Sequence, residues 1–159
     1  MEQIEKVIEL SKELSRIGLE VNKINFNYKI ETNKDSKFWK TKLENFQNYS
    51  EKCISYYNVC YSILKLFNSE ESQIFLFKIS KYRQMTTKIE KFIEEIIKNP
   101  AIMSSKDMQQ SKWSKESKMN FTESFQNCLI HEKDMNSKFN EFYEKNIKFQ
   151  IEGKINKQD

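Results

Sequence analysis

Apolar residues recur along the first part of the chain at alternating spacings of three and four residues. This spacing puts them on one face of an α-helix and is typical of a helix that packs lengthwise against another. We therefore expect one long helix that reaches Tyr28, although Gly18 inside it costs about 1 kcal/mol relative to alanine. The residues of this face are Val7, Leu10, Leu14, Ile17, Val21, Ile24 and Tyr28.

The same spacing returns in two further stretches, each preceded by residues that favour a helix start. A polar turn over 31–36, with Asp35 or Ser36 as N-cap, predicts a second long helix, which should pack antiparallel to the first. Asn68 and the acidic residues that follow it predict the start of a third, which Pro100 ends. The second face consists of Trp39, Leu43, Phe46, Ser50, Cys53, Tyr57, Cys60, Leu64 and Phe67, and the third of Phe75, Ile79, Tyr82, Ile89, Ile93 and Ile96.

The periodicity stops after Pro100 and resumes in weaker form. Residues 101–112 show no clear period and predict a linker or hinge, in which Ile102, Met103 and Met108 can pack locally. Beyond it the pattern predicts two shorter helices, separated by the stretch from Leu129 to Asp134 and followed by a frayed tail. Their apolar positions are Trp113, Phe121, Phe125 and Cys128 in the first, and Met135, Phe139, Phe142 and Phe149 in the second.

These patterns predict an all-α fold, with a bundle of three long helices in residues 1–100, the linker at 101–112 and a unit of two shorter helices in residues 113–151. The chain of 159 residues has the length of one ordinary domain, so we expect a single compact unit overall. Two glycines and one proline are too few for the turns of β-rich folds or for Gly-rich phosphate loops. The composition therefore argues against β-rich, Rossmann and P-loop proteins.

Charge and cysteine usage limit the compartment and the partners. The formal net charge of +4 is spread along the chain, which gives only a weak attraction to nucleic acid or anionic membranes. There is no signal-peptide pattern at the N-terminus and no apolar run of membrane-spanning length, so we expect a protein of the cytosol or nucleus. The three cysteines match no zinc motif, which predicts reduced, buried thiols.

No group of residues carries the pattern of a catalytic, metal or cofactor site. His131 is the only histidine, and we interpret it as a loop residue between the two short helices. Most carboxylates alternate with lysines, as expected for solvated helix faces, so no pair of carboxylates can be inferred. We therefore expect a protein that is not an enzyme, and a small helical enzyme is the least favoured reading.

Lysines on two helices are the candidates for nucleic-acid or partner binding. Lys81, Lys88 and Lys91 lie away from the apolar face of the third helix and could meet phosphates. On the last helix Lys138, Lys145 and Lys148 share a flank, but acidic residues alternate with them. Plain solvated faces remain the alternative for both sets. An exposed row of Tyr56, Tyr61 and Phe77 would instead mark a protein interface.

The segment that begins at Trp113 resembles the opening helix of SANT and Myb-type domains, which are related to homeodomains. In that family Trp is followed by Ser or Thr, Glu comes three residues after the Trp, and apolar residues eight and twelve positions on face the core. Trp113, Ser114, Glu116, Phe121 and Phe125 follow this pattern. The resemblance implies a homeodomain-like unit, but no contact residue can be transferred because the family's reading helix is not matched.

Composition and size also make the chain similar to the small homeobox-like accessory proteins of ciliate DNA adenine methyltransferase complexes. This resemblance implies a nuclear, non-catalytic subunit whose chemistry lies in partner chains. Such a subunit would bind DNA, chromatin or other protein subunits.

Two functional hypotheses follow. The first is a nuclear accessory subunit of a DNA-acting or chromatin complex, and it expects residues 113–150 to form a compact helical unit with an exposed basic helix. The alternative is a helical adaptor that docks into a larger assembly without nucleic acid, and it expects three long helices to dominate the fold. Homo-oligomerisation stays open, because the face of the first helix can be buried within the bundle or between two copies.

Overall fold

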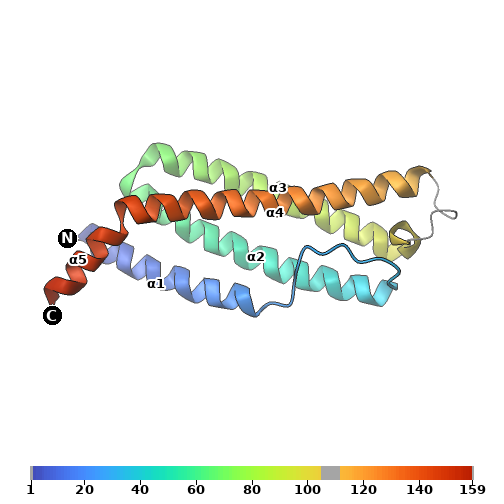
Figure 1. The fold of residues 1–159 in the computed structure, drawn as a ribbon, viewed down its shortest axis with the longest axis horizontal. Coiled ribbons are helices and arrows are strands. Elements are labelled where there is room, and N and C mark those ends of the chain that lie inside the picture. Colours follow the sequence, from blue (N-terminus) through green and yellow to red (C-terminus); the bar gives the residue numbers. More distant parts are fainter. Residues whose placement is uncertain (1, 105–111, 159) are drawn as a thin grey trace.

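The computed structural model describes the backbone of residues 2–104 and 112–158, and their side chains except those of 69, 112–114 and 154–158. The described part of the chain is helical and contains no strand, which confirms the predicted all-α fold (Figure 1). The elements are α1 (Glu2–Lys23), α2 (Ser36–Phe67), α3 (Ser69–Lys98), the short 3₁₀ helix η1 (Pro100–Met103), α4 (Lys112–Asn146) and α5 (Lys148–Gln158).

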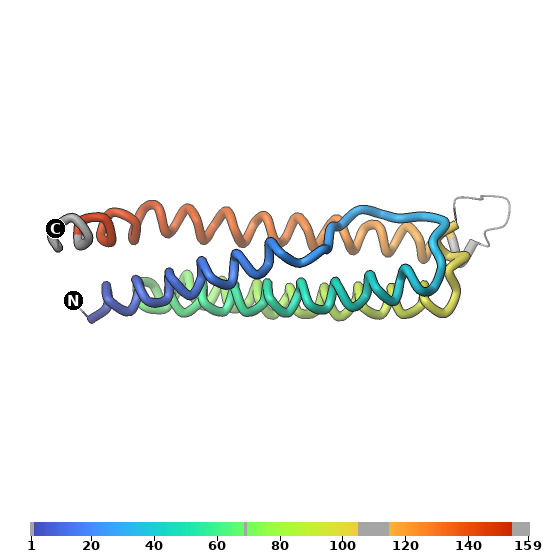
Figure 2. Tube along the Cα trace, turned by 90° about the horizontal axis from the view of Figure 1, so that it is seen from below, coloured from blue at the N-terminus to red at the C-terminus, as the bar shows by residue number. Residues whose placement is uncertain are grey.

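The four long helices form an elongated bundle in which consecutive helices run antiparallel. α2 and α3 are joined by a tight turn and pack along most of their length, and α4 returns beside α3 (Figure 1). α1 packs on α2 and covers only the half of the bundle nearest the termini, and α5 continues beyond α4 at that same end (Figure 2).

An aspartate caps the N-terminus of α2 and an asparagine caps that of α3, as the sequence predicts. The Asp35 carboxylate accepts a hydrogen bond of 2.8 Å from the backbone N–H of Phe38 at the start of α2. The Asn68 side chain accepts one of 3.1 Å from the N–H of Glu71 at the start of α3. Both bonds satisfy backbone donors that a helix leaves without partners in its first turn.

The first helix is shorter than predicted, because α1 ends at Lys23 and the chain then runs extended to Asp35. In this connecting segment, residues 24–35, side chains between Ile24 and Ile30 alternate between half-buried and exposed, as in a strand. The segment lies along the bundle beside α4, where α1 is absent (Figure 2). The predicted position of Tyr28 on a helix face is therefore wrong, although its side chain does pack against the core.

The connecting segment is held at both ends by polar contacts to the bundle. Lys42 Nζ, on α2, donates a hydrogen bond of 3.1 Å to the Asn27 carbonyl oxygen. Near the other end the N–H of Asn33 donates one of 2.9 Å to the carbonyl oxygen of Met103 in η1. Asn33 has a φ of 58°, a left-handed conformation that asparagine tolerates better than most residues.

The expected break in the last third is absent. Residues 112–146 form one continuous helix, so the predicted pair of shorter helices and the loop from Leu129 to Asp134 are wrong. Residues 105–111, most of the predicted linker, lie outside the described part of the chain, and η1 occupies its start with Ile102 and Met103 buried. Phe149 falls on α5 and is exposed.

The core is a single apolar cluster that receives residues from both sides of Pro100. Among its largest fully buried side chains are Trp39, Phe46, Tyr82, Phe121 and Phe125. The predicted faces of α2 and α3 are buried at nearly every position, which confirms their helical phase. Among the described residues, no helix combines the length and apolar character needed to cross a membrane.

Candidate functional site

An acidic residue lies in the apolar core of the bundle. Glu132 is at the middle of α4, and its side chain is 4% exposed. It occupies a core position of this helix, because buried residues follow one another at spacings of four and three. These residues are Phe121, Phe125, Cys128, Glu132, Met135, Phe139 and Phe142.

Two tyrosine hydroxyls donate hydrogen bonds to the Glu132 carboxylate, one to each oxygen. Tyr28, on the connecting segment, donates to Oε2, and Tyr49, on α2, donates to Oε1. The Tyr28 hydroxyl also lies 3.3 Å from the Cys128 thiol. Among the described residues no lysine or arginine forms an ion pair with Glu132, so its carboxylate is stabilised by hydrogen bonds and not by an opposite charge.

Burial determines the protonation of Glu132 and of the two thiols near it. It raises the pKa of Glu132 to about 7, and the two tyrosine hydrogen bonds oppose that rise in part. Burial also raises the pKa of the Cys53 and Cys128 thiols to about 12, so both stay protonated at neutral pH. Tyr82, from α3, is fully buried, and its hydroxyl has no hydrogen-bond partner among the described residues.

Glu132 lines a cavity of about 520 Å³ between α1 and α4. Four of its lining residues are aromatic, and exposed Asn22, Asn136 and Asn140 form its rim, so it opens to solvent. Its lining includes one carboxylate and no lysine or arginine. The lining residues are Gly18, Val21, Asn22, Ile24, Phe26, Tyr49, Cys53, Tyr56, Tyr57, Glu132, Asn136 and Asn140.

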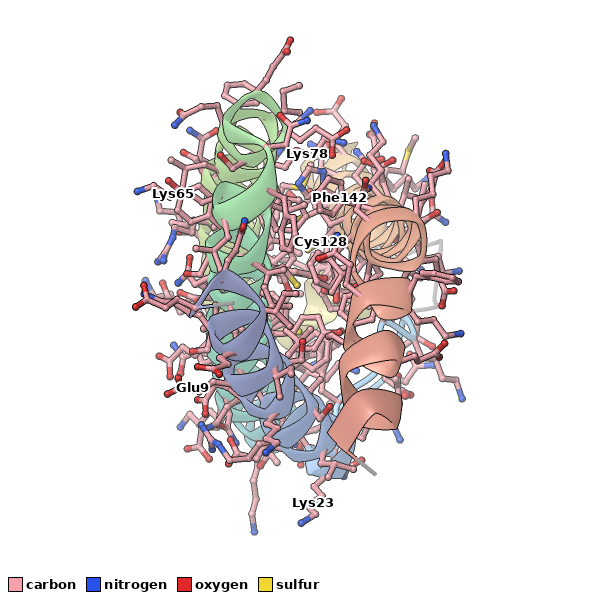
Figure 3. The ribbon with its side chains drawn as sticks, turned by 90° about the vertical axis from the view of Figure 1, so that its left-hand side faces the viewer. Glu9, Lys23, Lys65, Lys78, Cys128 and Phe142 are labelled. Carbon is pink, nitrogen blue, oxygen red and sulfur yellow. The ribbon has the colours of Figure 1, made fainter. Side chains whose placement is uncertain are left out.

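A second depression, of about 340 Å³, lies between α3 and α4 near the turn that joins α2 to α3. We call it the α3–α4 groove. Viewed along the bundle, Phe142 points into the interior and Lys78 lies at the edge of the same region (Figure 3). The groove is lined by apolar residues with a rim of lysines and glutamates: Leu64, Glu71, Ile74, Phe75, Lys78, Lys138, Phe139, Glu141, Phe142, Lys145 and Asn146.

The two predicted sets of lysines differ in their ion pairs. Lys81, Lys88 and Lys91 are exposed on α3, and none of them forms an ion pair among the described residues. On α4 and α5, each lysine of the other set lies near a carboxylate four residues earlier: Lys138 with Asp134 at 3.7 Å, Lys145 with Glu141 at 3.1 Å and Lys148 with Glu144 at 3.4 Å. The carboxylates beside the second set weaken its attraction for phosphates.

His131 is a helix residue, so its predicted place in a loop is wrong. Its Nε2 lies 2.8 Å from the Lys78 carbonyl oxygen on α3, and its ring stacks on Tyr82 at an interplanar angle of 13°. The three cysteines are free and buried, as predicted. No group of three or more metal-ligating side chains occurs in the part of the chain that the structure describes.

Glu132 and its two tyrosines are missing from the sequence-based candidates. Because Glu132 stands between His131 and Lys133, the acid looks like part of a solvated stretch. A signal was present, since Glu132 lies four residues after Cys128 and three before Met135, in phase with the apolar positions on either side. Tyr28 could be paired with it only once the connecting segment was known to be extended.

Neither a family model, nor a curated protein, nor a solved structure matches the chain. The likeness to SANT and homeodomain-like modules therefore depends on the residues quoted for it. Of these, Phe121 and Phe125 face the core as expected and Glu116 is exposed, while the side chain of Trp113 lies outside the described residues.

Proposed function

We propose that this protein is a non-catalytic helical adaptor that docks onto a partner protein through the α3–α4 groove. The observation that carries the proposal is the groove itself, an apolar depression with a charged rim on an elongated bundle. Long helices that dominate the fold are what the adaptor hypothesis expects. A single 35-residue helix in place of two short ones lends no support to a separate compact unit after Pro100.

The groove suits an amphipathic segment of a partner. Phe75, Phe139 and Phe142, each at most 9% exposed, form its apolar floor, and Ile74 beside them is 53% exposed, a large area for an isoleucine in water. A partner helix with apolar anchors one turn apart would bury this surface. Its polar flanks would meet charges of both signs on each side, Glu71 and Lys78 on α3 and Glu141 with Lys138 and Lys145 on α4, which favours a partner that also carries charges of both signs.

The test is the mass of the assembly in extracts of the cells that produce the protein. The chain alone is 19.2 kDa, and we expect it to elute in a larger species on size exclusion. Ile74→Asp should release it, because a carboxylate in the groove opposes burial. Leu19→Asp is the matched control, since Leu19 is equally apolar and 63% exposed on α1. The proposal is contradicted if the wild-type protein elutes at the mass of the free chain, or if the two variants elute at the same mass.

A second candidate function is nucleic-acid binding by α3, within a nuclear accessory subunit of a DNA-acting or chromatin complex. The observation that favours it is the absence of ion pairs at Lys81, Lys88 and Lys91 among the described residues, because unpaired lysines keep their charge for phosphates.

This second candidate is tested by titrating duplex DNA at several salt concentrations. Replacing Lys81, Lys88 and Lys91 by Gln should lower the slope of log affinity against log salt by about three, one for each phosphate contact. The same change at Lys138, Lys145 and Lys148 is the control and should have a smaller effect, because these lysines are ion-paired. No binding at low salt excludes the candidate.

A further inference from the structure

The cavity between α1 and α4 has a charged group at its base and no opposite charge to balance it. The lining includes the Glu132 carboxylate and neither lysine nor arginine. Each carboxylate oxygen accepts one tyrosine hydrogen bond, and a carboxylate offers about four acceptor positions, so acceptor capacity remains. A buried carboxylate is stabilised most by a cation that also donates hydrogen bonds.

The walls of the cavity suit the same kind of group. The rings of Phe26, Tyr49, Tyr56 and Tyr57 line it, and aromatic faces attract cations through their negative electrostatic potential. Asn136 and Asn140, one and two turns beyond Glu132 on α4, place amide groups at the rim. The volume of about 520 Å³ lies in the range of small-molecule sites.

We infer that this cavity binds a small organic ammonium ion, with its N–H groups on the Glu132 carboxylate and its carbon skeleton against the aromatic walls. The site is independent of the proposed docking groove, because it lies on the α1 side of α4 and shares no lining residue with that groove. Binding would supply the cation that the protein's own side chains do not provide.

Affinity should depend on pH through Glu132, because only the ionised carboxylate pairs with an ammonium ion. The titratable groups that face it come from every neighbouring element: Tyr28 on the connecting segment, Tyr49, Cys53 and Tyr57 on α2, Tyr82 on α3 and Cys128 on α4. Burial raises the pKa of each of these hydroxyls and thiols, so they stay protonated while Glu132 titrates.

The experiment titrates the full chain with phenethylammonium chloride, followed by NMR, and uses 2-phenylethanol as the neutral analogue of the same shape. We expect saturable binding of the amine at about pH 8 that weakens at least about tenfold at about pH 5, where Glu132 is protonated. Binding of 2-phenylethanol should be at least about tenfold weaker, since it lacks the charge.

Two pairs of variants on α4, each a change in the cavity with a matched control, distinguish loss of the binding site from general effects of substitution. Glu132→Gln should weaken the amine at least about tenfold, whereas Glu123→Gln, at an exposed acid of the same helix, should leave affinity unchanged. Asn136→Arg puts a guanidinium one turn from Glu132, where it occupies the place of the ligand, so it should abolish binding. Asn127→Arg makes the same change at an exposed position of α4 outside the cavity lining and should not.

Three results would overturn the inference. One is the absence of saturable amine binding by the folded wild-type protein. The second is equal affinity for the amine and the alcohol. The third is unchanged amine affinity in a folded Asn136→Arg protein, which decides the matter even where Glu132→Gln does not fold.

Discussion

The hydroxyl of Tyr28 donates a hydrogen bond to Oε2 of Glu132, which joins the connecting segment to the middle of α4 across 104 positions of sequence. Tyr49 on α2 donates to the other oxygen of the same carboxylate. One buried acid thus links three elements that come from different parts of the chain. Its protonation affects how strongly these elements hold together.

Stability should fall as the pH rises through the titration range of Glu132. Burial raises the pKa of this acid from its ordinary value of 4.5 to about 7. Between these values the folded state binds more protons than the unfolded state, so raising the pH favours unfolding. This rise corresponds to roughly 3 kcal/mol of unfolding free energy, which is present below about pH 4.5 and lost as the pH rises to about 7.

Urea unfolding at several pH values checks this, with Glu132→Gln as the variant that cannot titrate. The difference in unfolding free energy between wild type and variant isolates Glu132 from other ionisable groups. This difference should change by roughly 2.5 kcal/mol between about pH 5 and about pH 8. A difference independent of pH would mean that the carboxyl is not buried in the folded protein.

Proline at position 130 tests whether α4 is continuous. Ile130 is 63% exposed on this helix, so its side chain contributes little to the core. Ile130→Pro should cost about 3 kcal/mol or more, because proline removes a backbone hydrogen bond and clashes with the preceding turn. Ile130→Ala, the matched control, should change stability by less than about 0.5 kcal/mol. If the protein tolerates this proline, residue 130 lies in a loop, as the sequence pattern suggested.

The polar residues around position 131 explain why that loop was predicted. Periodicity located α2 and α3 because their core faces are apolar almost throughout. In α4 the glutamate at 132 replaces an apolar core residue, so the pattern breaks where the helix does not. Its burial depends on hydrogen bonds from Tyr28 and Tyr49, partners 104 and 83 positions away, which no local pattern reveals.

The end of α1 was missed for a different reason. Val21, Ile24 and Tyr28 continue the helical spacing, but Ile24 and Tyr28 also satisfy a spacing of two when Phe26 and Ile30 are counted. Packing decides between the two, because the extended chain brings Phe26 and Tyr28 together against Phe46 and Phe125. The candidate lysines were identifiable from charge alone, and the ion pairs that distinguish the second set join each lysine to a carboxylate four residues earlier in the sequence.

The left-handed conformation of Asn33 predicts a difference between two substitutions at that position. Both Asn33→Gly and Asn33→Ala remove the side chain, so their comparison reports the backbone alone. At a φ of 58° alanine is strained and glycine is not, so the glycine variant should be more stable by about 1 kcal/mol. Thermal or urea unfolding measures this, and equal stabilities would show that the segment does not hold this conformation.

Gly18 offers a stabilising change within α1. A Cβ atom there would lie 3.5 Å from Cε2 of Tyr56, an ordinary van der Waals contact. Gly18→Ala should therefore raise the unfolding free energy by about 0.5–1 kcal/mol, because alanine loses less conformational entropy in a helix. Gly153→Ala is a comparison in α5, where nothing lies within 4 Å of the added Cβ. A destabilising effect at position 18 would indicate tighter α1–α2 packing.

The titration of Glu132 itself, followed by NMR of ¹³C-labelled glutamate side chains, tests the account most directly. The Glu132→Gln variant assigns the resonance, since it removes one signal. A carboxyl buried between Tyr28 and Tyr49 should titrate with a midpoint near 7, well above the ordinary glutamate value of 4.5. A midpoint near 4.5 would place Glu132 in water and contradict both the buried site and the ammonium site inferred from it.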